Sequence, residues 1–196
     1  MALRAVLIDL DGTLWDSAPW FAYLLSPEDA AERRRLAGAL CDPAAGLRAA
    51  SLIAERYTKS RFAAACTDEA SRLALYPGAS DVLQRLHEHV RLGVVTNLPG
   101  WIASPMLAAQ GIDELFTHVQ TAQRGVPPKP HPAGITRAAT GLGVDTTEVV
   151  YLGDSRADST AAARAGVSFL WASWGYDTIA EPVTSATSWM DVGALA

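Results

Sequence analysis

The sequence predicts an α/β protein in which a parallel β-sheet is covered by helices on both faces. Short apolar runs rich in β-branched residues alternate with stretches of helical patterning along most of the 196 residues. One long helical stretch interrupts this alternation directly after the first apolar run. Carboxylate side chains follow the first and fourth apolar runs. Because ligands collect at the carboxyl ends of parallel strands, these observations place the functional residues at one edge of the sheet, beneath a helical insertion.

Five strands and four helices make up the predicted alternation. The strands are expected where apolar residues run continuously, as in buried parallel sheets, at Ala5–Ile8, Leu92–Val95, Leu115–Val119, Val149–Leu152 and Val167–Trp171. The helices are expected between them, at Ser80–Val90, Ile102–Gln110, Pro132–Thr140 and Ser159–Ala165. The segment after Tyr176 is weakly patterned and is expected only to pack against the core.

The helical insertion extends from about Ser17 to Tyr76. This segment contains no β-rich run, and its patterning predicts two or three helices. Pro and Gly in "YPGAS" mark the return to alternation. We therefore predict a core made of residues 1–15 and 77–196, with a helical cap of residues 16–76 over the carboxyl end of the first strand.

The composition argues against several classes of protein. With 49% hydrophobic and 19% charged residues, the chain can bury a sizeable core, so global disorder is not expected. The formal net charge of −5 argues against nucleic acid or an anionic membrane as the main partner. No apolar run approaches the about 20 residues that a membrane span needs, and no signal-peptide pattern is evident. Cys41 and Cys66 lack metal-ligand spacing, so we expect free thiols and a cytoplasmic location.

Seven polar residues are predicted to converge at the carboxyl edge of the sheet. They follow strands directly, except that Lys129 comes after a longer loop: Asp9, Asp11, Thr96, Asn97, Lys129, Asp154 and Asp158. Carboxylates gathered in one place repel one another unless a cation offsets their charge. Their hard oxygens suit Mg²⁺, which prefers one or two protein carboxylates with waters and a phosphate oxygen. A lysine, a threonine hydroxyl and free backbone N–H groups in the Gly12 turn would hold that phosphate.

Four motifs, in this order, resemble those of the haloacid dehalogenase-like superfamily. They are "DLDGT" at Asp9–Thr13, "VVTN" at Val94–Asn97, "PKPHP" at Pro128–Pro132 and "YLGDSRAD" at Tyr151–Asp158. The helical insertion is similar to the type 1 cap of the branch that contains phosphoglycolate phosphatases and β-phosphoglucomutases. "YPGASDVLQRL" matches the return from that cap, and "WGY" at Trp174–Tyr176 is similar to a phrase common among phosphoglycolate phosphatases. The resemblance implies a Rossmann-like three-layer core around the parallel sheet.

The resemblance also implies roles for the carboxylates. Asp9 would be the nucleophile that forms an aspartyl-phosphate. Asp11 would protonate the leaving oxygen and then deprotonate the attacking water. Asp9, Asp154 and the backbone carbonyl of Asp11 would bind Mg²⁺. Asp158 would lie behind them and hold a metal-bound water or Lys129.

The remaining motif residues would bind the phosphoryl group. Thr96 and Lys129 would stabilise its charge during transfer, and Asn97 would orient the phosphate or the segment after the first motif. Trp15 follows that motif closely and is a candidate for lining the substrate cleft between core and cap. A cap cation that recognises substrate charge is left open among three residues, Arg48, Lys59 and Arg61.

These roles predict a Mg²⁺-dependent phosphatase for a small phosphorylated metabolite, such as phosphoglycolate or a sugar phosphate. A phosphomutase of the β-phosphoglucomutase type remains an alternative, because it uses the same four motifs. A dehalogenase or a phosphonoacetaldehyde hydrolase is disfavoured, since neither keeps an acid at the position of Asp11. A regulatory module phosphorylated on Asp9 is disfavoured because Asp11 and the cap are present. The oligomeric state stays open between a monomer and a homodimer.

Overall fold

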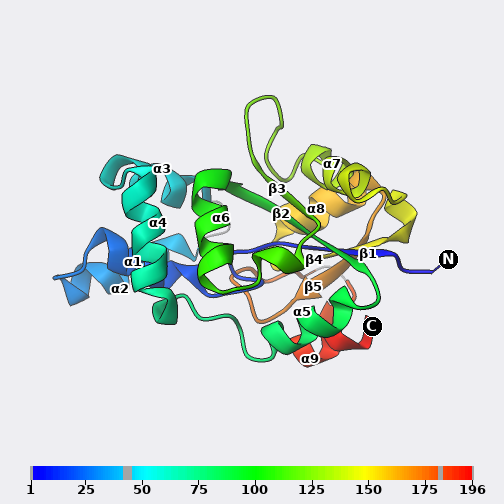
Figure 1. Ribbon diagram of the computed structural model, residues 1–196, viewed down its shortest axis with the longest axis horizontal. Helices are drawn as coiled ribbons and strands as arrows, with labels where there is room; N and C mark the ends of the chain where they lie inside the picture. Colours follow the sequence, from blue (N-terminus) through cyan, green and yellow to red (C-terminus); the bar gives the residue numbers. More distant parts are fainter. Residues whose placement is uncertain (1, 42–45, 181–182, 196) are drawn as a thin grey trace.

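A computed structural model describes residues 2–41, 46–180 and 183–195 of the chain (Figure 1). Within these residues the strands form one six-stranded sheet in the order β3-β2-β1-β4-β5-β6, and all neighbouring strands are parallel. The strands are β1 (Ala5–Ile8), β2 (Arg91–Pro99), β3 (His118–Ala122), β4 (Val149–Gly153), β5 (Ser168–Ala172) and β6 (Ser185–Ala186). The parallel sheet is therefore confirmed, with one strand more than predicted.

The central strand β1 determines which chain segments meet at the carboxyl edge. All four of its side chains are buried, as expected for a strand that is covered on both faces. Ile8 at its end is level with Val94 of β2 and Leu152 of β4. The backbone N–H of Asp9 still donates to the carbonyl oxygen of Leu152 at 2.9 Å. The segments that continue from β1 and its two neighbours therefore begin at one edge of the sheet.

Helices cover both faces of the sheet, because alternate side chains of each strand point to opposite faces. Val6 and Ile8 join an apolar cluster on one face, and Ala5 and Leu7 join a second cluster on the other. Figure 1 shows α7 and α8 on one side of the sheet and α5 and α9 on the other. The core helices are α5 (Ala79–His87), α6 (Gly100–Ala109), α7 (Ala133–Leu142), α8 (Arg156–Ala165) and α9 (Trp189–Val192). This arrangement confirms the three-layer core.

The insertion after β1 is helical, as predicted, and its described part holds four α-helices rather than two or three. We call them the cap helices: α1 (Ser17–Leu25), α2 (Ala30–Leu40), α3 (Gly46–Arg56) and α4 (Lys59–Asp68). Phe62 of α4 packs edge-on against Trp101 of α6, with ring centroids 5.5 Å apart, and against Trp20 of α1 at 5.6 Å. These aromatic contacts attach the cap helices to the core.

The two segments that connect the cap helices to the core lie side by side. Trp15 forms an antiparallel bridge with Leu75, and the backbone N–H of Tyr76 donates to the carbonyl oxygen of Leu14 at 3.0 Å. Both contacts lie next to the predicted boundaries at residues 15 and 77. The division of the chain into core and cap stays a prediction that these contacts support.

Two predicted strands differ in their bounds by three or more residues at one or both ends, while β4 and β5 differ by a single residue at an end. β3 begins at His118 rather than at Leu115, because Leu115 ends a 3₁₀ helix (Asp113–Leu115) and fills the core from that turn. β2 continues to Pro99, so Thr96 and Asn97 belong to its irregular end instead of following it. Leu115 therefore resembled the start of a strand although it lies in a turn. Thr96 and Asn97 were expected after a strand but still belong to it.

The segment after Tyr176 adds structure that its weak patterning did not predict. Ser185 and Ala186 form β6, which pairs with β5 at the edge of the sheet. Trp189 and Val192 of α9 are buried against the face that α5 covers. This segment therefore completes the core as well as packing on it.

None of the helices in the described ranges is both long and apolar enough to cross a lipid bilayer. Cys41 and Cys66 carry free thiols, as expected. Burial raises the pKa of the Cys66 thiol to about 12, so this group stays protonated at neutral pH.

Candidate active site at the carboxyl edge of the sheet

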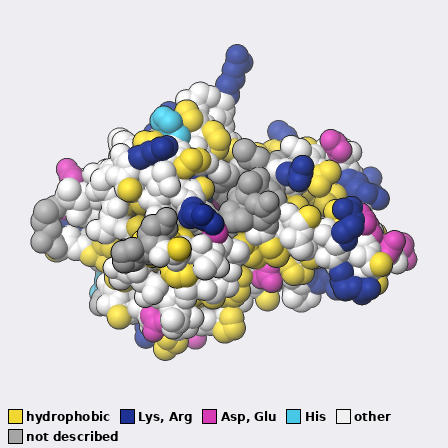
Figure 2. All heavy atoms as spheres, turned by 180° about the vertical axis from the view of Figure 1, so that it is seen from behind, with side chains coloured by type: hydrophobic (Ala, Val, Ile, Leu, Met, Phe, Trp, Pro, Cys, Tyr) yellow, Lys and Arg dark blue, Asp and Glu magenta, His cyan; other side chains and the backbone are white. Residues whose placement is uncertain are grey.

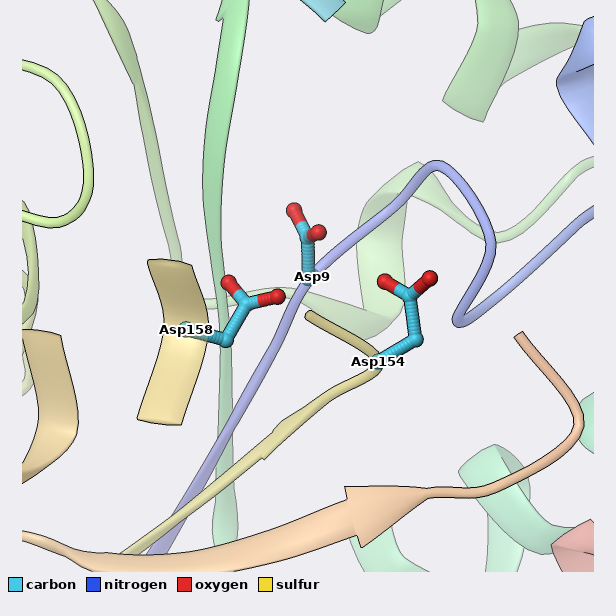
Figure 3. A group of neighbouring side chains, drawn as sticks. All are labelled: Asp9, Asp154 and Asp158. Atoms are coloured by element: carbon cyan, nitrogen blue, oxygen red, sulfur yellow. The ribbon is translucent and has the colours of Figure 1, made fainter. Parts of the chain in front are cut away.

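Three carboxylates meet where the predicted site was expected (Figure 3). Asp9 follows β1, Asp154 follows β4, and Asp158 lies in the first turn of α8. Each contributes an oxygen to a group whose atoms all lie within 4.8 Å of one another. All three side chains are buried, and Asp158 is fully so. Sequence segments more than 140 residues apart therefore build one acidic cluster.

Lys129 lies at the centre of this cluster. Its Nζ is 2.7 Å from Oδ1 of Asp9 and 2.7 Å from Oδ1 of Asp158. It also donates to the hydroxyl of Tyr151 at 2.9 Å. Burial alone would lower the pKa of Lys129, but the charges of Asp158 and Asp9 outweigh it and raise this pKa. The ammonium group therefore stays charged in a buried position.

Tyr151 was not predicted as a site residue. It is fully buried on β4, and its hydroxyl donates to Oδ1 of Asp158 at 2.7 Å. The motif "YLGDSRAD" contains this tyrosine, yet within an apolar strand its ring suggests only packing. The position of the Tyr151 hydroxyl, three residues before the aspartate that follows the strand, is the signal that could have indicated its place in the site.

Asp158 uses both of its oxygens on protein groups. Oδ1 accepts from Lys129 and Tyr151, and Oδ2 accepts from the backbone N–H of Ser155 at 3.0 Å and from its hydroxyl. Burial would raise the pKa of Asp158, but Lys129 outweighs it and lowers this pKa. A Cβ at Gly153 would lie 2.6 Å from Cγ of Asp158, so this close approach requires glycine. Asp158 is placed to orient Lys129.

Asp9 and Asp154 are the carboxylates of the cluster that also line the cleft, whereas Asp158 lies behind them. Oδ2 of Asp9 has no partner among the described residues, and Asp154 accepts 3.2 Å and 2.7 Å bonds from the Thr13 hydroxyl and the Tyr176 backbone N–H. Burial, together with the charge of Asp158, raises the pKa of Asp154 to about 7. Burial also raises the pKa of Asp9, although Lys129 opposes this. In both groups burial is the largest cause, and the charges of neighbouring carboxylates add to it.

This donor set fits a divalent metal ion. Three carboxylates face one ammonium group within the cluster, which leaves two negative charges for a cation to offset. Carboxylate oxygens are hard ligands of the kind that Mg²⁺ and similar ions prefer. The glycine at position 12 keeps the space open, because φ there is +79° and a Cβ would lie 2.8 Å from Cγ of Asp154.

Asp11 lies beside this cluster and also lines the cleft. Its Oδ1 accepts hydrogen bonds from the hydroxyl of Ser17 at 2.5 Å and from the indole N–H of Trp15 at 3.3 Å. Desolvation raises the pKa of Asp11, and these two hydrogen bonds partly oppose the shift. A carboxyl group held in this way can keep a proton closer to neutral pH than an exposed aspartate does.

Trp15 differs from its prediction. Its side chain is fully buried and does not line the cleft. The connecting segment pairs with Leu75, which turns the indole into the core, and only its N–H reaches Asp11. Trp15 therefore orients Asp11 instead of contacting space open to a ligand.

Thr96 and Asn97 both line the cleft, but they make different contacts. The Thr96 hydroxyl accepts from the backbone N–H of Leu98 at 3.1 Å, which leaves its own proton for another acceptor. The Asn97 amide exchanges two hydrogen bonds with the backbone of Lys129, of 2.9 Å and 3.3 Å. Asn97 is thus placed to hold the loop that carries the lysine.

The cleft has a volume of about 540 Å³, within the range typical of small-molecule sites. Asp9, Asp154 and Lys129 line its floor. Residues of α1, α2 and α3 form the facing wall, so the insertion covers the carboxyl edge as predicted. Tyr176 lines the cleft as well and connects core to cap, because its hydroxyl bonds both Asp16 and the backbone N–H of Ala18.

Comparison with known proteins places this geometry in a family. Residues 3–166 match the sequence model of the haloacid dehalogenase-like hydrolases. The chain belongs to the haloacid dehalogenase-like hydrolase family. It is similar to the phosphoglycolate phosphatase of Xanthomonas campestris pv. campestris, with 34% identity over 194 residues that cover 88% of this chain and 84% of that protein. The phosphoglycolate phosphatase of Photorhabdus laumondii is 31% identical over 200 residues, covering 89% and 82%.

Solved structures share the fold of this hydrolase at lower identity. A haloacid dehalogenase-superfamily hydrolase of subfamily IA from Geobacter sulfurreducens superposes with a TM-score of 0.74 at 22% identity, covering both chains completely. The L-2-haloacid dehalogenase of Xanthobacter autotrophicus superposes equally well, with a TM-score of 0.74 at 18% identity over 98% of each chain. One fold therefore supports different reactions, and the residues of the site decide between them.

Proposed function

We propose that this hydrolase is a Mg²⁺-dependent phosphomonoesterase that acts on a small phosphorylated metabolite through an aspartyl-phosphate. The observation that carries the proposal is the pair Asp9 and Asp11 at one end of the cleft. Burial raises the pKa of both groups, but the ion pair with Lys129 favours the carboxylate form of Asp9. A nucleophile and a proton carrier side by side are what stepwise phosphoryl transfer needs. The named phosphoglycolate phosphatases support the same reaction class.

The metal would be held by carboxylate oxygens of Asp9 and Asp154 and by the backbone carbonyl of Asp11. Bound Mg²⁺ would offset the repulsion between the nucleophile and the phosphate oxygens. Lys129 and the hydroxyl of Thr96 would bind the transferring phosphoryl group from the protein side. Asp158 and Tyr151 would keep the lysine in position through the contacts described above.

In the first step a carboxylate oxygen of Asp9 attacks phosphorus. The new bond joins this oxygen to phosphorus, and the bond from phosphorus to the leaving oxygen breaks. Asp11 gives its proton to that oxygen, so the leaving group departs as an alcohol. The raised pKa of Asp11 supports this role, because a proton must be available near neutral pH.

In the second step a water molecule attacks the phosphorus of the aspartyl-phosphate. Asp11, now a carboxylate, takes a proton from this water, and the bond between Asp9 and phosphorus breaks. Inorganic phosphate is released and both aspartates return to their starting state. The cap helices would exclude bulk water during the first step and admit one water in the second.

Hydrolysis of 4-nitrophenyl phosphate tests this proposal. Phosphate release should require Mg²⁺, stop when EDTA removes the ion, and fall to background in Asp9→Asn. Asp68→Asn is a suitable control, because this exposed aspartate at the end of α4 lies outside the cleft. Full activity in Asp9→Asn would contradict the nucleophile assignment. Transfer of phosphate to a second sugar hydroxyl, without release of free phosphate, would favour the phosphomutase alternative.

A further inference from the structure

The wall that the cap helices present to the cleft is almost entirely apolar. Its described side chains are Phe21 of α1, Leu40 of α2, Ala49 of α3 and the hydroxyl of Ser17. That hydroxyl already donates to Asp11. Leu98 adds a further apolar side chain from the core side. A leaving group that extends from the phosphate toward the cap would therefore meet hydrocarbon.

Two cations line the described part of the cleft, and both are already paired. Lys129 contacts two carboxylates at the floor. Arg156 lies at the rim with 68% of its side chain exposed, and its Nε is 3.5 Å from Oδ2 of Asp177. The candidate cap cations Arg48, Lys59 and Arg61 are exposed and do not line the cleft. Figure 2 shows Lys and Arg side chains on the outer surface at the cap end.

The charge of the lining also disfavours a second anion. Three carboxylates, from Asp9, Asp154 and Asp177, face the two cations, and the carboxyl group of Asp11 is taken as protonated before the reaction. A divalent metal ion and a phosphate dianion bring charges that cancel each other, so the lining keeps its excess of carboxylates. A carboxylate on the leaving group would lose its hydration and find no free cation among the described residues. Such an unpaired charge is unfavourable where water is partly excluded.

We propose that the preferred substrate is a phosphate monoester whose leaving group is uncharged and partly apolar. This inference rests on the proposed function, because it takes the phosphate to lie at Asp9. It separates this chain from its named relatives, since phosphoglycolate carries a carboxylate on its leaving group. Phe21, Leu40, Ala49 and Leu98 are the residues that determine this specificity. The volume of about 540 Å³ leaves room for a leaving group larger than glycolate.

Two matched pairs of esters test the charge preference directly. 2-Hydroxyethyl phosphate and 2-phosphoglycolate have the same chain length. The first ends in an uncharged hydroxyl group and the second in a carboxylate. Phenyl phosphate and 4-carboxyphenyl phosphate form an aromatic pair, in which the carboxyl substituent makes the phenol the better leaving group. We expect kcat/KM for the uncharged member of each pair to exceed that of the anionic member by at least about tenfold. Equal values, or a preference for the carboxylate in either pair, would overturn the proposal.

Substitutions at Leu40 test whether the cap wall is responsible. Leu40 is the last residue of α2, where a lysine suits the negative end of the helix dipole. Leu40→Lys should shift the kcat/KM ratio of each pair toward the anionic ester by about fivefold or more. Leu40→Met, a neutral side chain of similar volume, should leave the ratios within twofold. Unchanged ratios in a folded Leu40→Lys variant would contradict the assignment of this wall.

Arg156 is the alternative determinant of the charge preference, because it could bind a substrate carboxylate. A substitution at this exposed residue leaves the apolar wall of the cap intact. If Arg156 accepted a substrate carboxylate, the wild-type enzyme would prefer the anionic esters and Arg156→Gln would abolish that preference. We expect instead that Arg156→Gln leaves the ratios unchanged. Release of no phosphate from any of the four esters would contradict the proposed function. The charge preference would then be measured separately, from the Kd values of phenylphosphonate and 4-carboxyphenylphosphonate. Tighter binding of 4-carboxyphenylphosphonate would contradict the proposed preference.

Discussion

Tyr176 and Asp154 are joined by a 2.7 Å hydrogen bond from the tyrosine backbone N–H to Oδ2 of the carboxylate. The hydroxyl of the same tyrosine donates to Asp16 at 2.7 Å and accepts from the backbone N–H of Ala18 at 3.1 Å. One residue of the "WGY" segment therefore contacts both the acidic cluster and the start of the first cap helix. The placement of the cap is thus connected to the placement of a carboxylate that we propose binds the metal.

Tyr176→Phe should loosen the cap and leave the backbone contact to Asp154 in place. We expect KM for 4-nitrophenyl phosphate to rise about threefold to tenfold, because α1 carries part of the cleft wall. The free energy of unfolding should fall by ~1 kcal/mol for the lost hydroxyl contacts. Tyr57→Phe is the matched control, since it removes a 3.1 Å bond to the carbonyl of Leu24 inside the cap. Equal KM changes in both variants would contradict the coupling.

Gly175→Ala should disturb Asp154, the carboxylate that we propose binds the metal. A Cβ at this position would lie 2.6 Å from both Oδ2 of Asp154 and the carbonyl oxygen of Gly12. We expect Mg²⁺ affinity, measured by calorimetry, to fall at least about tenfold because Asp154 must move. Gly38→Ala is the control, since its Cβ would meet nothing within 4 Å and helix propensity should stabilise α2 by ~1 kcal/mol. Wild-type affinity in Gly175→Ala would show that Asp154 tolerates displacement.

Asp11→Asn should separate proton transfer from binding. The variant keeps the shape of the side chain and the backbone carbonyl, so the Kd for Mg²⁺ should change by less than about threefold. Turnover should fall by about 10²–10⁴, the usual contribution of general acid–base catalysis. The loss in the aspartylation step should be smaller for 4-nitrophenyl phosphate than for phenyl phosphate, because nitrophenolate departs without a proton. Equal losses for the two esters in single-turnover experiments would argue against Asp11 as the acid.

Binding of Mg²⁺ should depend on pH through Asp154, whose pKa is raised to about 7 by burial and by Asp158. Below this pH the carboxyl group is protonated and must release its proton to bind the ion. The Kd should therefore weaken about tenfold per pH unit below 7 and level off above it. Calorimetry in two buffers of different ionisation enthalpy measures the released proton. A Kd that is constant between pH 5.5 and 8 would contradict the shift.

The same pKa affects the stability of the metal-free protein in a defined direction. An unfolded aspartate titrates near 3.8, so between about 4 and 7 the folded state binds the extra proton at Asp154. The contribution of this group to the free energy of unfolding should therefore decrease as pH rises through that window. Asp154→Asn should remove this contribution, which comparison of thermal unfolding at pH 5 and pH 8 measures.

The sheet and the position of the site were predictable because they follow from local patterns. Continuous apolar runs indicated buried parallel strands, and parallel strands bring their carboxyl ends together. Asp9 and Asp154 were therefore expected at one edge although they lie far apart in sequence. β6 was not predictable, since two residues carry no periodic signal. The start of β3 was misplaced because Leu115 is apolar in a turn as it would be in a strand.

The contacts between the site residues were less predictable than their location. Whether Asn97 points at a ligand or at the backbone of Lys129 depends on loop geometry that residue types do not specify. Trp15 was expected in the cleft because it closely follows the first motif, yet its side chain is fully buried beside the bridge to Leu75. From the sequence, Tyr151 is expected only to pack within a strand. The structure shows that its buried hydroxyl contacts Lys129.

The most direct test of the central claim is to find where the phosphoryl group is held during turnover. Asp11→Asn, which should slow hydrolysis of the covalent species, is mixed with 4-nitrophenyl phosphate and Mg²⁺, quenched in acid, digested and analysed by mass spectrometry. We predict a single phosphoryl group on the peptide that contains Asp9, and none after the same treatment of Asp9→Asn/Asp11→Asn. A phosphoryl group on another residue, or rapid phosphate release without any covalent species, would contradict the assignment of Asp9 as the nucleophile.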